Sequence, residues 1–196
     1  MSTEITISEQ RILDAAKKVF QAEGYKGARM QQIADEAEIS KASLHYYFRS
    51  KEKLFEKISD DTMQDFLPIT ATWDDSTDKW ENKIREFVVN FMHFVQTKPL
   101  LFIISEFNRN PEAFKQKKKH KAKFISYFEK LRDEGKIKDI DAVMLFTFIH
   151  SLCCYPVLNE NFFKAYSGLH ERNYKQLMEE YPKTVGELII NYIKKK

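Results

Sequence analysis

The sequence contains few helix-breaking residues and almost none of the patterns that build β-sheets. Its 196 residues include only five glycines and five prolines. We find no alternating runs of β-branched residues flanked by Asn-Gly or Gly-Gly turns, and apolar residues recur instead at helical spacing. The length suffices for one or two domains with a substantial core. The sequence therefore predicts an all-α protein.

Cysteines are scarce, and no long hydrophobic run occurs. Cys153 and Cys154 are adjacent, and neighbours on a helix point about 100° apart, so we expect no disulfide. The most apolar segment, AVMLFTFIHSLCCYPVL (142–158), is slightly short for a membrane span and contains polar residues, so we interpret it as a buried helix. The N-terminal MSTEITISEQ has no apolar core typical of a signal peptide. We therefore expect a cytoplasmic protein with no membrane partner.

Patterns typical of enzymes and metal sites are also missing. The sequence has no glycine-rich phosphate loop and no G-x-S-x-G motif. His170-Glu171 begins like H-E-x-x-H, but Tyr174 occupies the last position of that motif. Cys153 and Cys154 have no metal-ligand spacing around them. We expect a protein that is not an enzyme and that has no cofactor and no metal ion.

Apolar stripes, caps and helix breakers predict the positions of the helices. A capping box at Thr6-x-x-Glu9 and a stop at Gly24 predict a first helix over about 7–23. Ser40 and Ser50 are candidate N-caps of two later helices, and Pro68 is expected to end the second of these. The further predicted helices cover about 29–37, 41–48, 51–67, 78–97, 99–109, 111–134, 140–155 and 183–195, with mixed helix and loop at 159–181.

The segment IADEAEISKASLHYYFRSKEKL (33–54) combines two short helices with many hydroxyl, basic and aromatic side chains. Leu44 and Phe48 are four residues apart and share the inner face of the second helix, so its other side chains point outward. Two short helices joined by a tight break form a helix-turn-helix pattern. A helix that enters the major groove needs short donors and acceptors, and apolar groups for thymine methyls. The segment therefore predicts a DNA-binding element.

The charge of this region supports DNA binding only locally. The first 60 residues contain ten basic and ten acidic residues, so their net charge is zero. Within 41–53, however, Glu52 is the only acid beside Lys41, Arg49, Lys51 and Lys53. A modest basic strip suffices if each half of a dimer makes few phosphate contacts. A polar, solvated face on a small helical bundle remains the alternative interpretation.

The segment ILDAAKKVFQAEGYKGARMQQIADEAEISKASLHYYFRSKEKLFEKI (12–58) resembles the TetR/AcrR family of bacterial transcriptional repressors. It carries A-x-x-x-F-x-x-x-G-[YF], then I-A-x-x-A, then S-K-x-x-L-x-x-Y-F-x-S-K-E-x-L. The resemblance implies a helix-turn-helix DNA-binding domain at 1–55 and a larger helical ligand-binding and dimerisation domain at 56–196. It further implies a homodimeric regulator, most simply a repressor, that binds a palindromic operator and is released by a small apolar or aromatic effector.

The resemblance also implies which residues contact DNA. Gln31 is expected at bases or phosphate, and Tyr47 and Lys51 at the phosphate backbone, while Ser43 and His45 suit base edges. Ala42 suits a thymine methyl group. The full expected set is Arg29, Gln31, Lys41, Ala42, Ser43, His45, Tyr46, Tyr47 and Lys51.

Three departures from the family pattern concern this element. Ala28 and Arg29 occupy places where the family has hydroxyl residues that cap the second helix. Glu38 replaces the turn glycine, and a non-glycine residue in a left-handed turn costs about 1 kcal/mol. His45 replaces the usual tyrosine. The departures keep an alternative open, namely a helical small-molecule sensor or interaction module whose DNA reader is degenerate.

The middle of the chain is rich in large aromatic side chains. As a set they suit an apolar ligand cavity with a few polar groups, although ordinary core packing accounts for any single one of them. The expected ligand-binding residues are Phe66, Phe87, Phe91, Phe94, Phe102, Glu106, Phe128, Phe146 and His150.

The two apolar helices predicted at 140–155 and 183–195 are candidates for the dimer surface. The first is apolar nearly all round at 142–149, so it should be covered on two sides. The family resemblance implies that both pack against their symmetry mates in a four-helix bundle, and a purely intramolecular core is the alternative. The expected dimer residues are Leu145, Leu152, Val185, Leu188, Ile189 and Tyr192.

Overall fold

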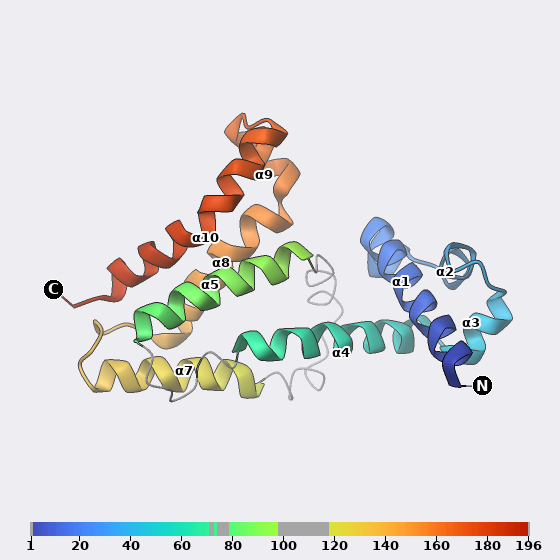
Figure 1. Cartoon of the computed structure of the whole chain (residues 1–196), viewed down its shortest axis with the longest axis horizontal. Helices are drawn as coiled ribbons and strands as arrows, with labels where there is room; N and C mark the ends of the chain where they lie inside the picture. The colour runs from blue at the N-terminus through green and yellow to red at the C-terminus, as the bar shows by residue number, and fades with distance from the viewer. Residues whose placement is uncertain (1, 71–72, 74–78, 98–117, 196) are drawn as a thin grey trace. The chain divides into compact units, whose positions relative to one another are not determined.

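The computed structural model describes residues 2–70, 73, 79–97 and 118–195, and these residues form a series of α-helices (Figure 1). Within these ranges the only strand-like pairing is an isolated bridge between Ile137 and Lys194. The prediction of an all-α fold is therefore confirmed. The chain forms two compact units, which divide inside α4 (Lys51–Thr70) between Asp65 and Phe66.

The N-terminal unit contains α1 (Ser2–Gly27), α2 (Met30–Glu36), α3 (Lys41–Tyr47) and the first part of α4. Gly24 interrupts α1 with a φ of 67°, as its predicted role as a helix stop requires. The predicted start near residue 7 is wrong, because α1 already begins at Ser2 and Thr6 lies inside it. The core is built from one stripe of α1 and the inner faces of the other helices, with Ile12, Ala16, Phe20, Ile33, Ala34, Leu44, Leu54 and Phe55 fully buried.

Both serine caps predicted in this unit are confirmed. The Ser40 hydroxyl accepts a hydrogen bond of 3.0 Å from the backbone N–H of Ser43, and the Ser50 hydroxyl accepts one of 3.3 Å from Lys53. Pro68 does not end α4, which continues to Thr70. Proline removes only one backbone hydrogen bond there, so in the last turn of a helix its cost is small enough for two further residues to stay helical.

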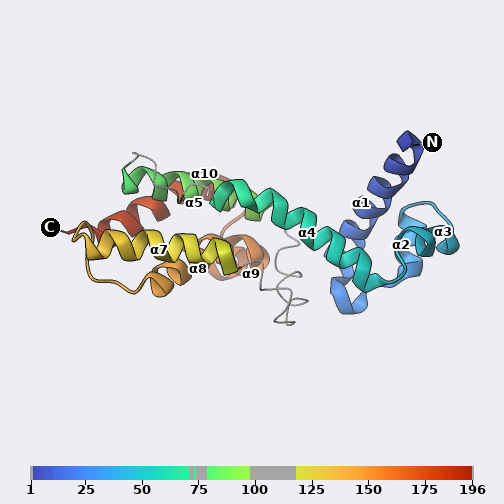
Figure 2. The same cartoon turned by 90° about the horizontal axis from the view of Figure 1, so that it is seen from below.

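The C-terminal unit contains α5 (Trp80–Thr97), α7 (Lys118–Asp133), α8 (Ala142–Leu158), α9 (Glu160–Ser167) and α10 (Glu171–Ile193). Helix α5 packs against α8 and α10, and α7 packs against α8 (Figures 1 and 2). The predicted helix at 99–109 and the start of the one at 111–134 lie outside the described residues.

The prediction of mixed helix and loop at 159–181 is confirmed, with a loop at 168–170 between two helices, but the predicted start of the last helix near residue 183 is wrong. Helix α9 occupies the first part, and α10 starts at Glu171 and continues through Pro182. Tyr174 and Met178 are buried, so packing holds the first turns of α10 in place ahead of the proline. Tertiary contacts here outweigh the local signal of a helix start.

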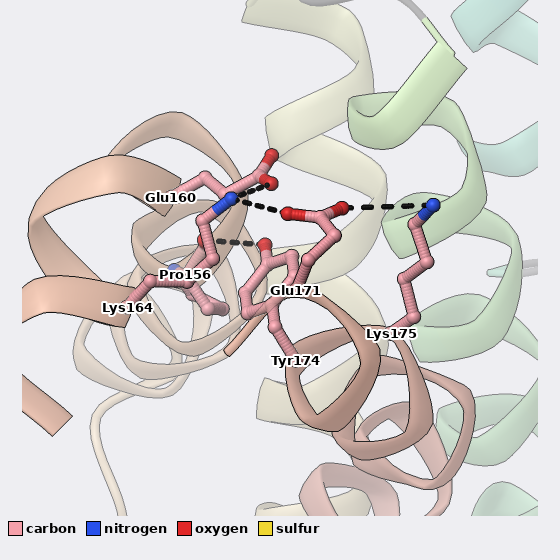
Figure 3. Close-up of polar contacts among 6 residues, drawn as sticks. All are labelled: Pro156, Glu160, Lys164, Glu171, Tyr174 and Lys175. Atoms are coloured by element: carbon pink, nitrogen blue, oxygen red, sulfur yellow. Dashed lines mark hydrogen bonds and ion pairs between the residues drawn. The ribbon is translucent and has the colours of Figure 1, made fainter. Parts of the chain in front are cut away.

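Polar contacts link α10 to both α8 and α9 (Figure 3). The Lys164 Nζ atom donates to Glu160 at 2.9 Å and to Glu171 at 2.7 Å. The Tyr174 hydroxyl donates to the Pro156 carbonyl oxygen at 2.8 Å. No side chain of α9 is fully buried, but the half-buried Phe163 ring lies 6.3 Å from Tyr155 of α8 and 6.2 Å from Tyr174 of α10, so ring packing and polar contacts together position this helix.

Cys153 and Cys154 are buried and free. Burial raises the pKa of the Cys154 thiol to about 11 and that of Cys153 further still, so both are protonated thiols at neutral pH.

Among the described residues, no single helix is long and apolar enough to cross a membrane. The same residues bring no three His, Cys, Asp or Glu side chains together in a way that would hold a metal ion.

Candidate nucleic-acid interface

Helix α3 has one buried face and one open face. Leu44 is 0% exposed and Phe48 packs beside it in the core, whereas Tyr46 is 85% exposed. This orientation follows from the spacing of the two apolar residues, which anchor α3 against the rest of the unit. The side chains left outside are Lys41, Ala42, Ser43, His45 and Tyr46. The structure therefore brings together on one exposed surface five of the residues predicted to contact DNA.

The turn between α2 and α3 keeps the geometry of a helix-turn-helix without a glycine. Glu38 adopts a φ of 51°, in the left-handed region. Its backbone N–H donates to the Asp35 carbonyl at 3.0 Å, and the N–H of Ile39 donates to the Ala34 carbonyl at 3.0 Å. The Glu38 carboxylate also forms an ion pair with Arg11 of α1. The turn is therefore formed despite the departure from the family pattern, at the cost of one strained residue.

We expect Glu38→Gly to raise the free energy of unfolding by up to about 2 kcal/mol. Glycine removes the left-handed penalty of about 1–2 kcal/mol, and the lost ion pair with Arg11 is exposed and contributes about 0–1 kcal/mol. Chemical denaturation followed by circular dichroism measures the change. Glu38→Ala is the matched control, since it loses the ion pair but keeps the strain and should be less stable than wild type. A Glu38→Gly protein less stable than wild type would show that the ion pair outweighs the strain.

Several predicted DNA-contacting side chains already have protein partners. The Gln31 amide donates to Asp35 at 2.8 Å, and the hydroxyls of Ser40 and Ser43 lie 2.9 Å apart. A hydroxyl offers one hydrogen and two lone pairs, so Ser43 keeps capacity for a further partner. Tyr46 and Tyr47 meet edge to face at 5.5 Å between ring centroids, which restricts the rotation of both rings.

Arg29 lies at the start of α2, where the family has a capping hydroxyl. Its backbone N–H donates to the Gln32 side-chain oxygen at 2.9 Å, so Gln32 supplies half of a capping box. The Arg29 side chain is exposed. It remains a candidate for phosphate contact.

Lys51, which was expected at the phosphate backbone, is directed into the protein. Its Nζ atom donates to the carbonyl oxygens of Tyr25 and Ala28, each at 2.8 Å, and lies 4.7 Å from the centre of the Tyr25 ring. An ammonium group has three donors, so two are already used here. Lys51 therefore connects the first turn of α4 to the end of α1 and to the segment that joins α1 and α2.

Tyr25 completes this connection. Its hydroxyl donates to Glu52 at 3.0 Å, and its ring packs edge to face on Phe55 at 5.0 Å. Burial raises the pKa of Tyr25 to about 12, so the phenol remains a donor at neutral pH. Hydrogen bonds from its own backbone amide, from Ser50 and from Tyr25 hold the pKa of Glu52 below its ordinary value. The partners lie more than 20 residues apart along the chain, so no local pattern pointed to this arrangement.

In the C-terminal unit, aromatic rings surround Trp73. Its ring centroid lies 4.9 Å from Phe87, 5.0 Å from Phe124 and 5.2 Å from Phe128. Lys83 was missed by sequence reasoning because a lysine usually lies on the surface. It is only 2% exposed, and its Nζ atom lies 5.2 Å from the centre of the Tyr127 ring. The cluster therefore combines aromatic rings with one buried ammonium group.

The predicted ligand-binding residues continue the same aromatic network, because Phe87 lies 5.5 Å from Phe91 and Phe124 lies 5.3 Å from Phe146. Phe91 lies 5.7 Å from Phe66 and 5.6 Å from His150, and His150 lies 6.0 Å from Phe146. Phe87, Phe94 and Phe128 are buried nearby in the same unit. The structure thus brings seven of the nine predicted residues into one unit, while Phe102 and Glu106 lie outside the described residues.

The predicted dimer residues separate into two groups. Leu145, Val185 and Ile189 are buried in the core of the chain, and Leu152 is half-buried. Leu188 and Tyr192 are 55% and 51% exposed. Only the exposed group is available to a second copy in this conformation.

Other exposed apolar residues lie on α8 and α10, and the sequence did not predict them: Met144, Phe148, Tyr155 and Leu177. Helix α8 is apolar nearly all round, so its periodicity does not reveal which side faces the core. On α8 these residues are spaced by four and seven, and on α10, with Leu188 and Tyr192 included, by eleven and four, which places each set on one side of its helix. Phe148 of α8 and Tyr192 of α10 meet edge to face at 6.2 Å, which joins the two stripes. We call this surface the α8–α10 apolar face, and it comprises Met144, Phe148, Tyr155, Leu177, Leu188 and Tyr192.

Comparison with known proteins places these features in a family. Residues 12–58 match the model of bacterial regulatory proteins of the TetR family. The chain is 30% identical over 153 residues to the HTH-type transcriptional regulator UidR of Escherichia coli, covering 74% of this chain and 76% of UidR. It is 48% identical over 48 residues to the HTH-type transcriptional repressor NicS of Pseudomonas putida, which is 24% of this chain and 23% of NicS.

A solved structure shows the same fold over nearly the whole chain. A TetR-family transcriptional regulator from Haemophilus influenzae superposes with a TM-score of 0.65 at 18% identity, covering 98% of this chain and 99% of that one. The helix-turn-helix geometry, the match over 12–58 and the similarity to UidR lead to one conclusion: the chain belongs to the TetR family of bacterial regulatory proteins and is a helix-turn-helix transcriptional regulator.

Proposed function

We propose that this regulator is a repressor that acts in the cytoplasm, binds a palindromic operator as a homodimer and is released by a small apolar or aromatic ligand. The observation that carries the proposal is the open face of α3. It presents Lys41, Ser43, His45 and Tyr46 to solvent while Leu44 holds the helix in place. Hydroxyl, imidazole and ammonium groups are those that contact base edges and phosphates. The name of NicS as a repressor supports the direction of regulation.

The α8–α10 apolar face supports the homodimer. Monomeric proteins rarely expose a contiguous apolar patch of more than a few hundred Å² unless it binds something. One helix-turn-helix buries little surface, so two copies on half-sites about one helical turn apart give useful affinity. A two-fold arrangement of identical faces would present two α3 helices to a palindrome.

The aromatic rings of the C-terminal unit support the apolar or aromatic effector. Phe66, Phe91, Phe146 and His150 form a continuous path of ring contacts, and His150 adds a polar group to it. A ligand that binds one dimer conformation better than the other shifts the population between DNA-competent and released states. In this proposal the ligand favours the released state.

The experiment that tests the DNA-binding part is selection of bound duplexes from a random pool at physiological salt, followed by sequencing. We expect a palindromic consensus, weakened by Ser43→Ala and unchanged by Lys123→Ala, an exposed lysine of α7 in the other unit. A folded, dimeric protein that enriches no motif, even after unfolding and refolding to strip bound ligand, contradicts the proposal. That outcome favours a sensor or interaction module with a degenerate DNA reader.

A further inference from the structure

His45 is held by one specific hydrogen bond at the end of α3. Its ring Nδ1 atom lies 3.2 Å from the carbonyl oxygen of Arg49, in the segment that follows the helix. A carbonyl oxygen only accepts hydrogen bonds, so Nδ1 must carry the hydrogen. A neutral imidazole has a single N–H group, so the other nitrogen, Nε2, has a free lone pair. Arg49 therefore determines the tautomer as well as the orientation of the ring.

The Nε2 atom is available to DNA. His45 is exposed, and among the described residues its ring has no hydrogen-bond partner other than the Arg49 carbonyl. It lies on the open side of α3, three residues after Ala42 and four after Lys41, which places the three side chains next to one another on the helix surface. Buried Leu44 and Phe48 fix this side of α3 outward.

The chemistry of the major groove then limits which bases suit this nitrogen. Adenine and cytosine present an exocyclic amine, N6 or N4, as a donor, whereas guanine presents O6 and N7 and thymine presents O4 as acceptors. A bare Nε2 atom can accept from the amines but has no hydrogen to give to guanine or thymine. Resting on the proposed function, we infer that His45 selects an amine-bearing base, adenine or cytosine, on the strand that faces it in each half-site.

The inference has a test that does not need DNA. Long-range ¹H–¹⁵N correlation spectra of ¹⁵N-labelled protein at pH 8 distinguish the two tautomers of a neutral imidazole ring. The signals that disappear in His45→Phe identify this ring among the five histidines. We expect the Nδ1–H tautomer. A dominant Nε2–H tautomer overturns the inference and leaves the proposed function untouched.

The second test uses operator duplexes with the amine removed. At the position where the selected motifs of wild type and His45→Phe differ, adenine is replaced by purine, or cytosine by pyrimidin-2-one, each lacking its exocyclic amine. We expect wild-type affinity at pH 8 to fall about three- to tenfold more than that of His45→Phe, the effect of one hydrogen bond. The analogue also weakens base pairing, but it does so equally for both proteins, so the difference between their losses of affinity excludes this effect. Tyr46→Phe is the matched control, because it removes a neighbouring polar group and should respond like wild type.

Each other outcome overturns the inference. Equal losses for wild type and His45→Phe show that His45 makes no contact with the amine, while the proposed function survives. Selection of guanine at this position, with sensitivity to 7-deazaguanine confined to wild type, shows that Nε2 is a donor. Failure of the wild-type protein to bind any duplex refutes the proposed function and this inference together.

Discussion

Phe148→Glu combined with Leu188→Glu should convert the proposed dimer into a monomer and lower its operator affinity by about 10²–10⁴-fold. That range is the usual gain from linking two binding modules. The two residues lie on different helices of the α8–α10 apolar face, and both are exposed in the single chain. The charges therefore cost little in the monomer. In a two-fold interface each would be buried near its own copy, where desolvation and like-charge repulsion oppose association.

Light scattering coupled to size-exclusion chromatography measures the mass, and a titration of operator DNA measures the affinity. Val89→Glu is the matched control, because Val89 is also an exposed apolar residue but lies on α5, outside the proposed interface. It should leave both values unchanged. A double variant that stays dimeric would place the interface elsewhere. A monomeric variant with full operator affinity would show that operator binding does not require a dimer.

Lys51→Met should destabilise the N-terminal unit by about 1.5–3 kcal/mol, the range for a hydrogen bond to a charged group. Methionine retains the apolar stem but leaves the carbonyl oxygens of Tyr25 and Ala28 without the ammonium donor. Hydrogen exchange of the α1 and α2 amides measures this loss. Both tryptophans, Trp73 and Trp80, lie in the C-terminal unit, so their fluorescence reports whether that unit is unaffected.

The same variant distinguishes two roles for Lys51. A lysine that neutralises a phosphate contributes about 0.9 to the slope of log affinity against log salt concentration, hence about 1.8 for a dimer. Lys51 is directed into the protein, so it should not neutralise a phosphate. We therefore expect Lys51→Met to have the same salt slope as wild type under conditions in which the N-terminal unit is folded. Lys41→Met is the comparison, since Lys41 is exposed on α3 and should lose slope without losing stability. A reduced salt slope for Lys51→Met together with unchanged stability would show that Lys51 contacts the phosphate backbone of DNA.

Local sequence was sufficient to predict most features of the helix-turn-helix. Ser40 and Ser50 were identified as caps because an N-cap bond joins residues only three apart, and the structure contains both bonds. The outward side of α3 followed from Leu44 and Phe48, which are four residues apart on a regular helix. The family match over 12–58 depends on the same short-range pattern.

Other features required contacts between residues far apart in the chain. The family resemblance implied that Lys51 contacts the phosphate backbone, and only the fold brings the carbonyl oxygens of Tyr25 and Ala28 to it. Lys83 became buried because α5 and α7 bring it beside Tyr127. Helix α10 starts at Glu171, and not near residue 183 as the sequence predicted, because Tyr174 and Met178 pack into the core.

The dimer candidates show the same division. The sequence by itself determined that α8 and α10 are apolar helices, because helical periodicity and composition are local properties. Only the tertiary structure decided that Leu145, Val185 and Ile189 face the core while Phe148, Leu188 and Tyr192 face solvent. The sequence of a helix that is apolar nearly all round does not determine which of its sides is buried. Packing against the neighbouring helices determines the buried side, and the side that stays exposed is available to a second copy.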